Sequence, residues 1–139
     1  MEDLIRKLIK KHKTSCPFEL ATAVGIHIRF ADLGDSTKGI YYKKLRRRFI
    51  VINIKLNDEW KRFVCAHELG HDRLHRGVGF YFIEENTFFN SGKFEREANE
   101  FATKLLLHGS EIEEGITCEQ HLRKHNIPSE MAKYLTRYC

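Results

Sequence analysis

The spacing of hydrophobic and polar residues changes several times along the chain, and the N-terminal part predicts two short helices. Residues 2–12 repeat apolar side chains at helical spacing with basic side chains opposite, which is typical of an amphipathic helix. Residues 17–24 place Pro17 in a first turn and are followed by Gly25. Proline is favoured at a helix start and glycine just past a helix end, so this segment predicts a second helix.

The period then becomes two, which predicts strands. Residues 26–30 alternate apolar with polar side chains, and residues 39–42 and 48–54 have the same strand-like composition on either side of a basic turn. Residues 79–83 are a candidate for a fourth strand. We therefore expect a small, mainly antiparallel sheet of three to four strands.

Helical spacing returns in the second half of the chain. A central helix is predicted to start at Asn57-Asp58, which supply capping side chains, and to stop before Gly77. A second long helix is predicted over residues 92–107. Thr117 begins a capping box, so the last ~25 residues should form a short helical pair packed on the rest. The pattern as a whole predicts an α+β fold in a single domain, residues 1–139.

Composition limits the classes of protein that fit. The chain has 139 residues, 42% of them hydrophobic, which suits one domain with an ordinary core. It has neither an apolar run long enough to span a bilayer nor a signal-peptide core at its start, so we expect a cytoplasmic protein without membrane contact. The four cysteines form no CxxC pair, and we expect reduced thiols.

The net charge is +5 and concentrates in the basic run 43–48. Such a run suits a nucleic-acid partner, but between two strands it also suits a solvated hairpin that protects the sheet edge. We favour the solvated hairpin. Contact with DNA or with an acidic protein is kept as an alternative.

The clearest chemical motif is HExxH in the central helix. His67 and His71 lie one turn apart on the same helix face, so both imidazoles can reach one metal ion. Glu68 points to the neighbouring part of the surface, where it can accept a proton from an activated water without binding the metal. The alternative, two core histidines with no metal, would leave two buried polar rings that need partners.

A catalytic zinc usually takes three protein ligands, so a further ligand should come from another element. The second long helix offers Glu95, Glu97 and Glu100. Glu97 flanks the apolar stripe that Phe94 and Ala98 begin, and we predict it as the third ligand. Glu95 is judged less well placed and more exposed, and Glu100 lies away from the centre of the stripe. The alternative for Glu97 is an ordinary surface acid.

The segments LGDSTKGIYYKK, RRRFIVIN, FVCAHELGHDRLH and KFEREANEFATKLLL resemble the ImmA/IrrE family of metallo-endopeptidases, and the resemblance covers nearly the whole chain. It implies a zincin-like fold, zinc (Zn2+) at His67, His71 and Glu97, and Glu68 as catalytic acid/base. Members of the family typically cleave a helix-turn-helix repressor of a phage or other mobile element. The resemblance thus implies a protein substrate of that class, whose cleavage relieves repression.

Other residues are weaker candidates. His75, one turn beyond His71, is either an outer hydrogen-bond partner of the metal site or a partner for the helix end. Tyr41 and Tyr42 are candidates for stabilising an oxyanion. Cys65 is predicted to be a small buried side chain rather than a redox switch, because it points away from His67 on the helix.

A rival function comes from a different class of protein. The chain would hold zinc but act as a regulatory binding module that sequesters a repressor or contacts DNA without proteolysis. Glu68 separates the two functions, because only the peptidase needs a general base.

Overall fold

The computed structural model describes residues 1–75, 81–85 and 92–135. Its elements are α1 (Glu2–His12), α2 (Pro17–Ala23), β1 (Ile26–Ala31), β2 (Thr37–Lys44), β3 (Arg47–Asn53), α3 (Asp58–Leu74), β4 (Tyr81–Glu85), α4 (Lys93–Leu106), α5 (Cys118–Lys124) and the 3-10 helix η1 (Ser129–Tyr134).

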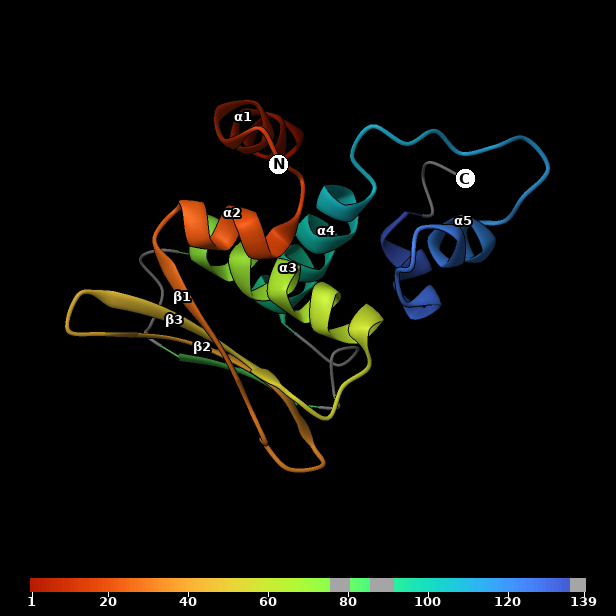
Figure 1. Cartoon of the computed structure of the whole chain (residues 1–139). Coiled ribbons are helices and arrows are strands. Elements are labelled where there is room, and N and C mark those ends of the chain that lie inside the picture. Colours follow the sequence, from red (N-terminus) through yellow and green to blue (C-terminus); the bar gives the residue numbers. More distant parts are fainter. Residues whose placement is uncertain (76–80, 86–91, 136–139) are drawn as a thin grey trace.

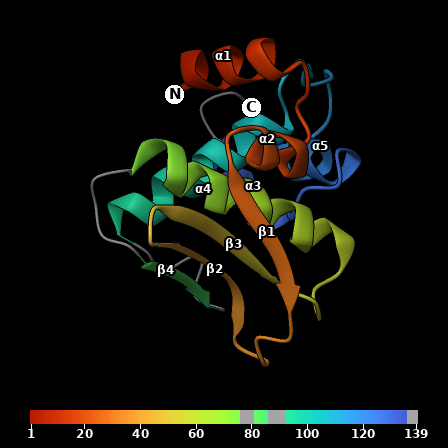
Figure 2. The same cartoon turned by 60° about the vertical axis from the view of Figure 1, so that its left-hand side comes forward.

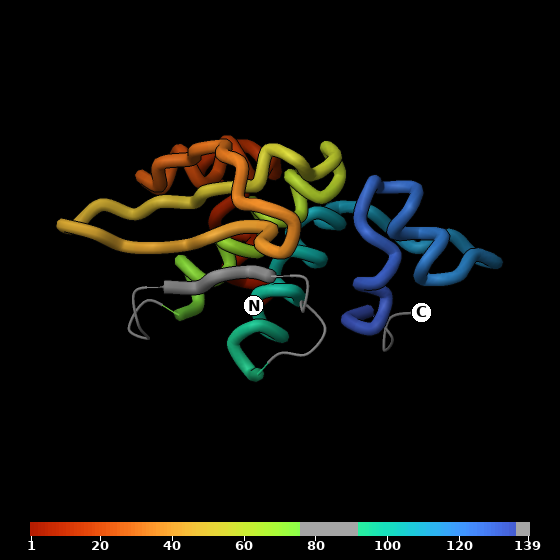
Figure 3. The backbone as a smooth tube through the Cα atoms, turned by 90° about the horizontal axis from the view of Figure 1, so that it is seen from below, coloured from red at the N-terminus to blue at the C-terminus, as the bar shows by residue number. Residues whose placement is uncertain are grey.

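The four strands form one mixed sheet in the order β1-β3-β2-β4. β1 runs parallel to β3, whereas β2 is antiparallel to both β3 and β4. The helices gather on one side of this sheet (Figures 1 and 2). Seen from below, the C-terminal helical pair lies at the end of the molecule opposite the β2-β3 hairpin (Figure 3). The predicted α+β fold with a mainly antiparallel sheet is confirmed.

The predicted elements match the observed ones closely, with a few differences. The last helix is a 3-10 helix that begins after Pro128, and the capping box at Thr117 is present as predicted. Of the predicted fourth strand, residues 81–83 lie in β4, while residues 79 and 80 lie outside the described residues. Helix α3 ends at Leu74, before Gly77 as predicted, although Gly77 itself lies outside the described residues. None of the helices in the described part of the chain combines the length and the apolar character needed to cross a bilayer.

The cysteines differ in part from the prediction of four reduced thiols. Cys16 and Cys65 are free, whereas Cys118 is disulfide-bonded. Cys65 is fully buried, and burial raises the pKa of its thiol well above the ordinary value. This environment favours the predicted role of a small buried side chain.

Helix α3 lies between the sheet and α4, and two glycines set these contacts. A Cβ atom on Gly70 would lie 3.0 Å from Cδ1 of Phe101, so the absence of a side chain lets α3 and α4 approach closely. A Cβ atom on Gly39 of β2 would lie 2.5 Å from Cγ1 of Val64 and 3.9 Å from Cγ of Glu68. β2 is thereby held directly against the HExxH segment of α3.

Adding a methyl group at Gly39 should therefore destabilise the protein. Gly39→Ala is expected to lower the free energy of unfolding by about 1–2 kcal/mol. The steric strain from the added methyl group outweighs the smaller stabilisation that comes from reduced conformational freedom of the unfolded chain. Urea unfolding followed by circular dichroism measures this change. Gly92→Ala is the control for an added methyl group without a clash, since none of the described atoms lies within 4 Å of its Cβ. Because Gly92 is the N-cap of α4, where alanine is less favourable, this variant should lose only about 0.5 kcal/mol. A Gly39→Ala protein as stable as the wild type would show that β2 does not pack this tightly on α3.

Candidate metal centre

Helix α3 presents the HExxH residues to the interior. It starts with Asn57 as N-cap, whose side chain accepts a hydrogen bond from the backbone nitrogen of Trp60 at 2.9 Å. From this start the buried face of the helix includes His67, Glu68 and His71, all with no exposed surface. Both imidazoles and the carboxylate are thus removed from bulk water.

The carboxylate of Glu95, on α4, lies against both histidines. Its Oε2 atom is 3.0 Å from Nε2 of His67, and its Oε1 atom is 3.0 Å from Nε2 of His71. One potential ligand atom from each of the three residues lies within 4.8 Å of the other two. The two helices therefore bring two imidazoles and one carboxylate to a common point.

The sequence predicts Glu97 at this point, and the structure places Glu95 there instead. Glu97 lies farther along α4, with Oε1 3.4 Å from Nε2 of His75. The difference comes from the phase of the apolar stripe: Phe94 is 37% exposed, whereas Asn99 and Thr103 are fully buried. The buried face of α4 is therefore rotated toward Glu95, which lies roughly 40° from Asn99 around the helix, while Glu97 lies roughly 200° away.

Glu100, the remaining acid of this helix, also lies outside the group. Its Oε1 atom is 2.7 Å from Nζ of Lys104, one turn further along α4. The pair is an ordinary i,i+4 ion pair on the helix surface. Glu100 is thus not among the three residues that the structure groups.

The imidazole of His67 is held at its other nitrogen by Asn99. The distance between Nδ1 of His67 and Oδ1 of Asn99 is 2.7 Å. An amide oxygen only accepts hydrogen bonds, so Nδ1 of His67 donates to it and, in the neutral ring, Nε2 is the nitrogen left to bind a metal ion. This is the tautomer that a metal ligand needs.

His71 is held in the same way by a second chain of hydrogen bonds. Its Nδ1 atom is 3.0 Å from Nδ1 of His75, and Nε2 of His75 faces the Glu97 carboxylate. Burial first, and then the neighbouring His71, lower the pKa of His75 and favour its neutral form. Glu97 can then accept from Nε2–H of His75, whose Nδ1 accepts from His71. The structure thus agrees with His75 as an outer partner of the site.

This donor set fits a divalent metal. Two neutral imidazoles and one carboxylate form the ligand set of one group of catalytic zinc sites, with a further position left for water. The same donors also suit manganese, iron or cobalt. Glu68 follows His67 directly on the buried side of α3, beside Gly39 of β2, and is not one of the three grouped residues.

A buried carboxylate at the end of α3 ties the helix to the sheet. Asp72 accepts hydrogen bonds from the Tyr41 hydroxyl at 2.6 Å, from Nη1 of Arg48 at 2.8 Å and from Nη2 of Arg73 at 2.6 Å. Burial alone would raise the pKa of Asp72, but these hydrogen bonds outweigh it and lower the pKa. An ionised Asp72 thus fixes the end of α3 just after His71.

The two tyrosines proposed for oxyanion stabilisation have other partners. The hydroxyl of Tyr41 is committed to Asp72, and burial, with that hydrogen bond, raises its pKa well above the ordinary value. The ring of Tyr42 stacks on that of Phe49, with ring centroids 4.8 Å apart. Neither arrangement supports the role that the sequence suggested for these tyrosines.

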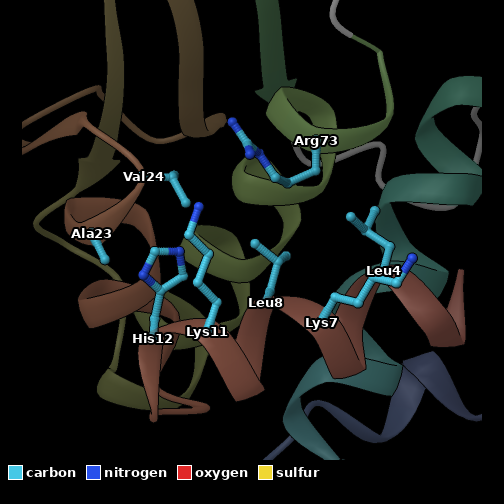
Figure 4. A pocket seen from close by; sticks show the side chains of 8 residues that line it. All are labelled: Leu4, Lys7, Leu8, Lys11, His12, Ala23, Val24 and Arg73. Atoms are coloured by element: carbon cyan, nitrogen blue, oxygen red, sulfur yellow. The ribbon is translucent and has the colours of Figure 1, made fainter.

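A cavity of about 370 Å³ lies between α1, α2 and the end of α3. Figure 4 shows its lining, Leu4, Lys7, Leu8, Lys11, His12, Ala23, Val24 and Arg73. The guanidinium of Arg73 is bound to Asp72, and none of the grouped metal-site residues contributes to the lining. The cavity is therefore separate from the histidine site.

Comparison with known proteins agrees with this site. The model of peptidase family M78, described as the IrrE N-terminal-like domain, matches residues 21–133. The chain belongs to this family. The matched range contains the HExxH motif and Glu95, so the residues that the structure groups together all lie within the family domain.

Two relatives illustrate the family. The chain is 45% identical to uncharacterized immunity region protein 2 of Bacillus phage phi105 over 103 residues, which cover 74% of this chain and 65% of that protein. It is 29% identical to metallopeptidase ImmA of Bacillus subtilis (strain 168) over 136 residues, which cover 94% of this chain and 80% of that protein. The chain thus spans just under two thirds of the phage relative's length.

Proposed function

We propose that this chain is a zinc-dependent endopeptidase in which His67, His71 and Glu95 hold the metal and Glu68 is the general acid/base. The observation that carries the proposal is the Glu95 carboxylate placed against Nε2 of both histidines, next to a fully buried Glu68. Membership of a peptidase family and the similarity to a metallopeptidase support it.

The chain's own residues supply most of the chemistry. When bound, the metal would act as a Lewis acid that polarises the scissile carbonyl and makes water a nucleophile at neutral pH. Glu68 takes the proton from the attacking water and later delivers it to the leaving amine. The hydrogen bonds at Nδ1 of His67 and His71 hold both rings so that Nε2 lies beside the Glu95 carboxylate, where the metal would be held. β4, at one edge of the sheet, offers backbone groups that can align an extended peptide by strand addition.

For the substrate, we propose a helix-turn-helix repressor of a phage or other mobile element, cleaved at one site to relieve repression. The resemblance to the ImmA/IrrE family supports this class, as does the similarity to an immunity region protein of a phage. Such a substrate would place the reaction in the cytoplasm. It requires no direct contact between this chain and DNA.

The test is cleavage of the repressor encoded nearest to the gene of this protein. Incubation of the two purified proteins with zinc should give two fragments from a single cut, located by mass spectrometry. The chelator 1,10-phenanthroline should stop the reaction, and added zinc should restore it; parallel reactions with manganese, iron and cobalt identify the most effective metal. An intact repressor under every metal condition, although it binds the protein, would favour the non-proteolytic binding module instead.

A further inference from the structure

Asn99 is bonded at both ends of its amide, and the second partner comes from the C-terminal helical pair. While Oδ1 lies 2.7 Å from Nδ1 of His67, Nδ2 donates to the hydroxyl of Tyr134 at 3.0 Å. Asn99 is fully buried, and Tyr134 is the last residue of η1. A continuous chain of hydrogen bonds therefore runs from η1 through α4 to the HExxH helix.

We propose that Tyr134 is a positioning residue for the metal site, acting through Asn99 on His67. The inference rests on the proposed metal site and adds a structural requirement to it: the site is complete only when the C-terminal helical pair is docked. Tyr134 lies one residue beyond the part of the chain that the family model matches, whereas the rest of the C-terminal helical pair lies within it.

The two hydrogen bonds act together on the amide. A side-chain amide held by one bond can turn about its last torsion angle, which is broad and weakly preferred. Attachment at both ends fixes the position and the plane of the Asn99 side chain. The carbonyl oxygen then meets the Nδ1 proton of His67, and the direction of Nε2 toward the metal follows.

Tyr134 can serve as an anchor because η1 is itself fixed. Met131 and Leu135, on either side of Tyr134 in sequence, are buried in the core. The turn between α5 and η1 is tied to α3 by Arg62, whose Nη1 atom donates to the carbonyl oxygen of His125 at 3.0 Å. The C-terminal helical pair is thus hydrogen-bonded to α3, the helix that carries the two histidines.

The two histidines differ in what supports them. His71 is supported by His75, which is next to it on α3, and by Glu97 of α4. His67 is supported by Asn99 of α4 and, through Asn99, by Tyr134, which lies 35 positions beyond Asn99 in the sequence. Loss of the Asn99–Tyr134 hydrogen bond should therefore weaken the support of His67, while the hydrogen bonds that support His71 stay intact.

The test uses the zinc dissociation constant of the full chain, measured by competition with a chromophoric chelator. Tyr134→Phe removes only the hydroxyl and is expected to raise the constant about fivefold, the loss of one ordinary hydrogen bond. Asn99→Ala removes the direct partner of His67 and should raise it about 10- to 100-fold. Tyr42→Phe, on the outer face of the sheet, should leave it unchanged. The absorption spectrum of the cobalt-substituted protein reports how the metal is coordinated. Thermal unfolding of the metal-free protein shows whether each variant is folded.

A conservative variant separates positioning from simple packing. Asn99→Asp keeps an acceptor for His67 and turns the bond to it into a stronger, charge-assisted one, so the side chain depends less on a second partner for its position. In the Asn99→Asp background, Tyr134→Phe should change the zinc dissociation constant less than about twofold. If the Tyr134 hydroxyl only packed against its neighbours, removing it would have the same effect in the wild-type and in the Asn99→Asp protein.

Each result decides the inference. A Tyr134→Phe protein that folds normally and binds zinc within about twofold of the wild type would overturn the inference. An equal loss of zinc affinity when Tyr134→Phe is made in the Asn99→Asp background would overturn it as well. If the wild type binds zinc but does not cut its repressor, the proposed function fails and the positioning role can still hold. If the wild type binds no zinc at all, both fail.

Discussion

Replacing Glu68 by glutamine is expected to slow peptide-bond cleavage by about 10²–10⁴-fold, the usual contribution of a general acid/base. Glutamine has nearly the same shape as glutamate but cannot take a proton from water. Because Glu68 is not one of the three residues grouped around the metal site, zinc binding and stability should change little. The rate is measured with the purified repressor at saturating zinc.

The same variant separates the peptidase from the rival binding module. Glu59→Gln makes the same chemical change in the first turn of α3 and should leave cleavage unaffected. Undiminished cleavage by Glu68→Gln would exclude Glu68 as the base. Derepression in cells that persists without cleavage would instead support a module that acts by sequestering the repressor.

Removing the proposed third ligand, Glu95, should affect metal binding itself. Glu95→Ala is expected to weaken zinc binding by more than about 100-fold, beyond the range of outer hydrogen-bond partners. Glu97→Ala should weaken it no more than about 10-fold, because Glu97 acts on His71 only through His75. The metal content of dialysed protein and chelator competition give the two values.

Glu95 and Glu97 form a well-matched pair of positions for this comparison. They lie on the same turn of α4, and their side chains are 25% and 35% exposed, so a general loss of stability should affect both variants similarly. The reverse order of effects would restore Glu97 as the ligand, as the sequence predicted. Equal and small effects would mean that neither acid binds the metal.

The sequence was sufficient for features that arise within one element. His67 and His71 share a face because any α-helix places residues i and i+4 together, and the capping residue Asn57 is next to the helix that it starts. For the same reason the bounds predicted for the helices were close to those observed. Such features need no knowledge of how the elements pack.

Which acid of α4 lies beside the two histidines depends on how α4 packs against α3, and the pattern of apolar residues along α4 does not show this. A stripe defined by apolar residues includes Phe94, which is partly exposed, and omits the polar residues Asn99 and Thr103, which are fully buried. A polar residue can face the interior when it has a partner, as Asn99 has in His67. The i,i+4 relation between Glu95 and Asn99 was the available signal for the correct face.

Long-range pairing was also beyond local patterns. β1 lies parallel to β3, and this pairing joins segments separated by the whole of β2. The alternation of side chains identifies each strand but not its neighbour or direction. The contact between Asn99 and Tyr134 is of the same kind, because it joins residues 35 positions apart that have no shared motif.

The most direct test of the central claim is a crystal structure of the protein grown with zinc, with anomalous differences measured at the zinc absorption edge. We expect one strong peak bonded to Nε2 of His67, Nε2 of His71 and the carboxylate of Glu95, with Glu68 beside the peak and not bonded to it. A peak bonded to Glu97, or the absence of any peak at these histidines, would contradict the claim.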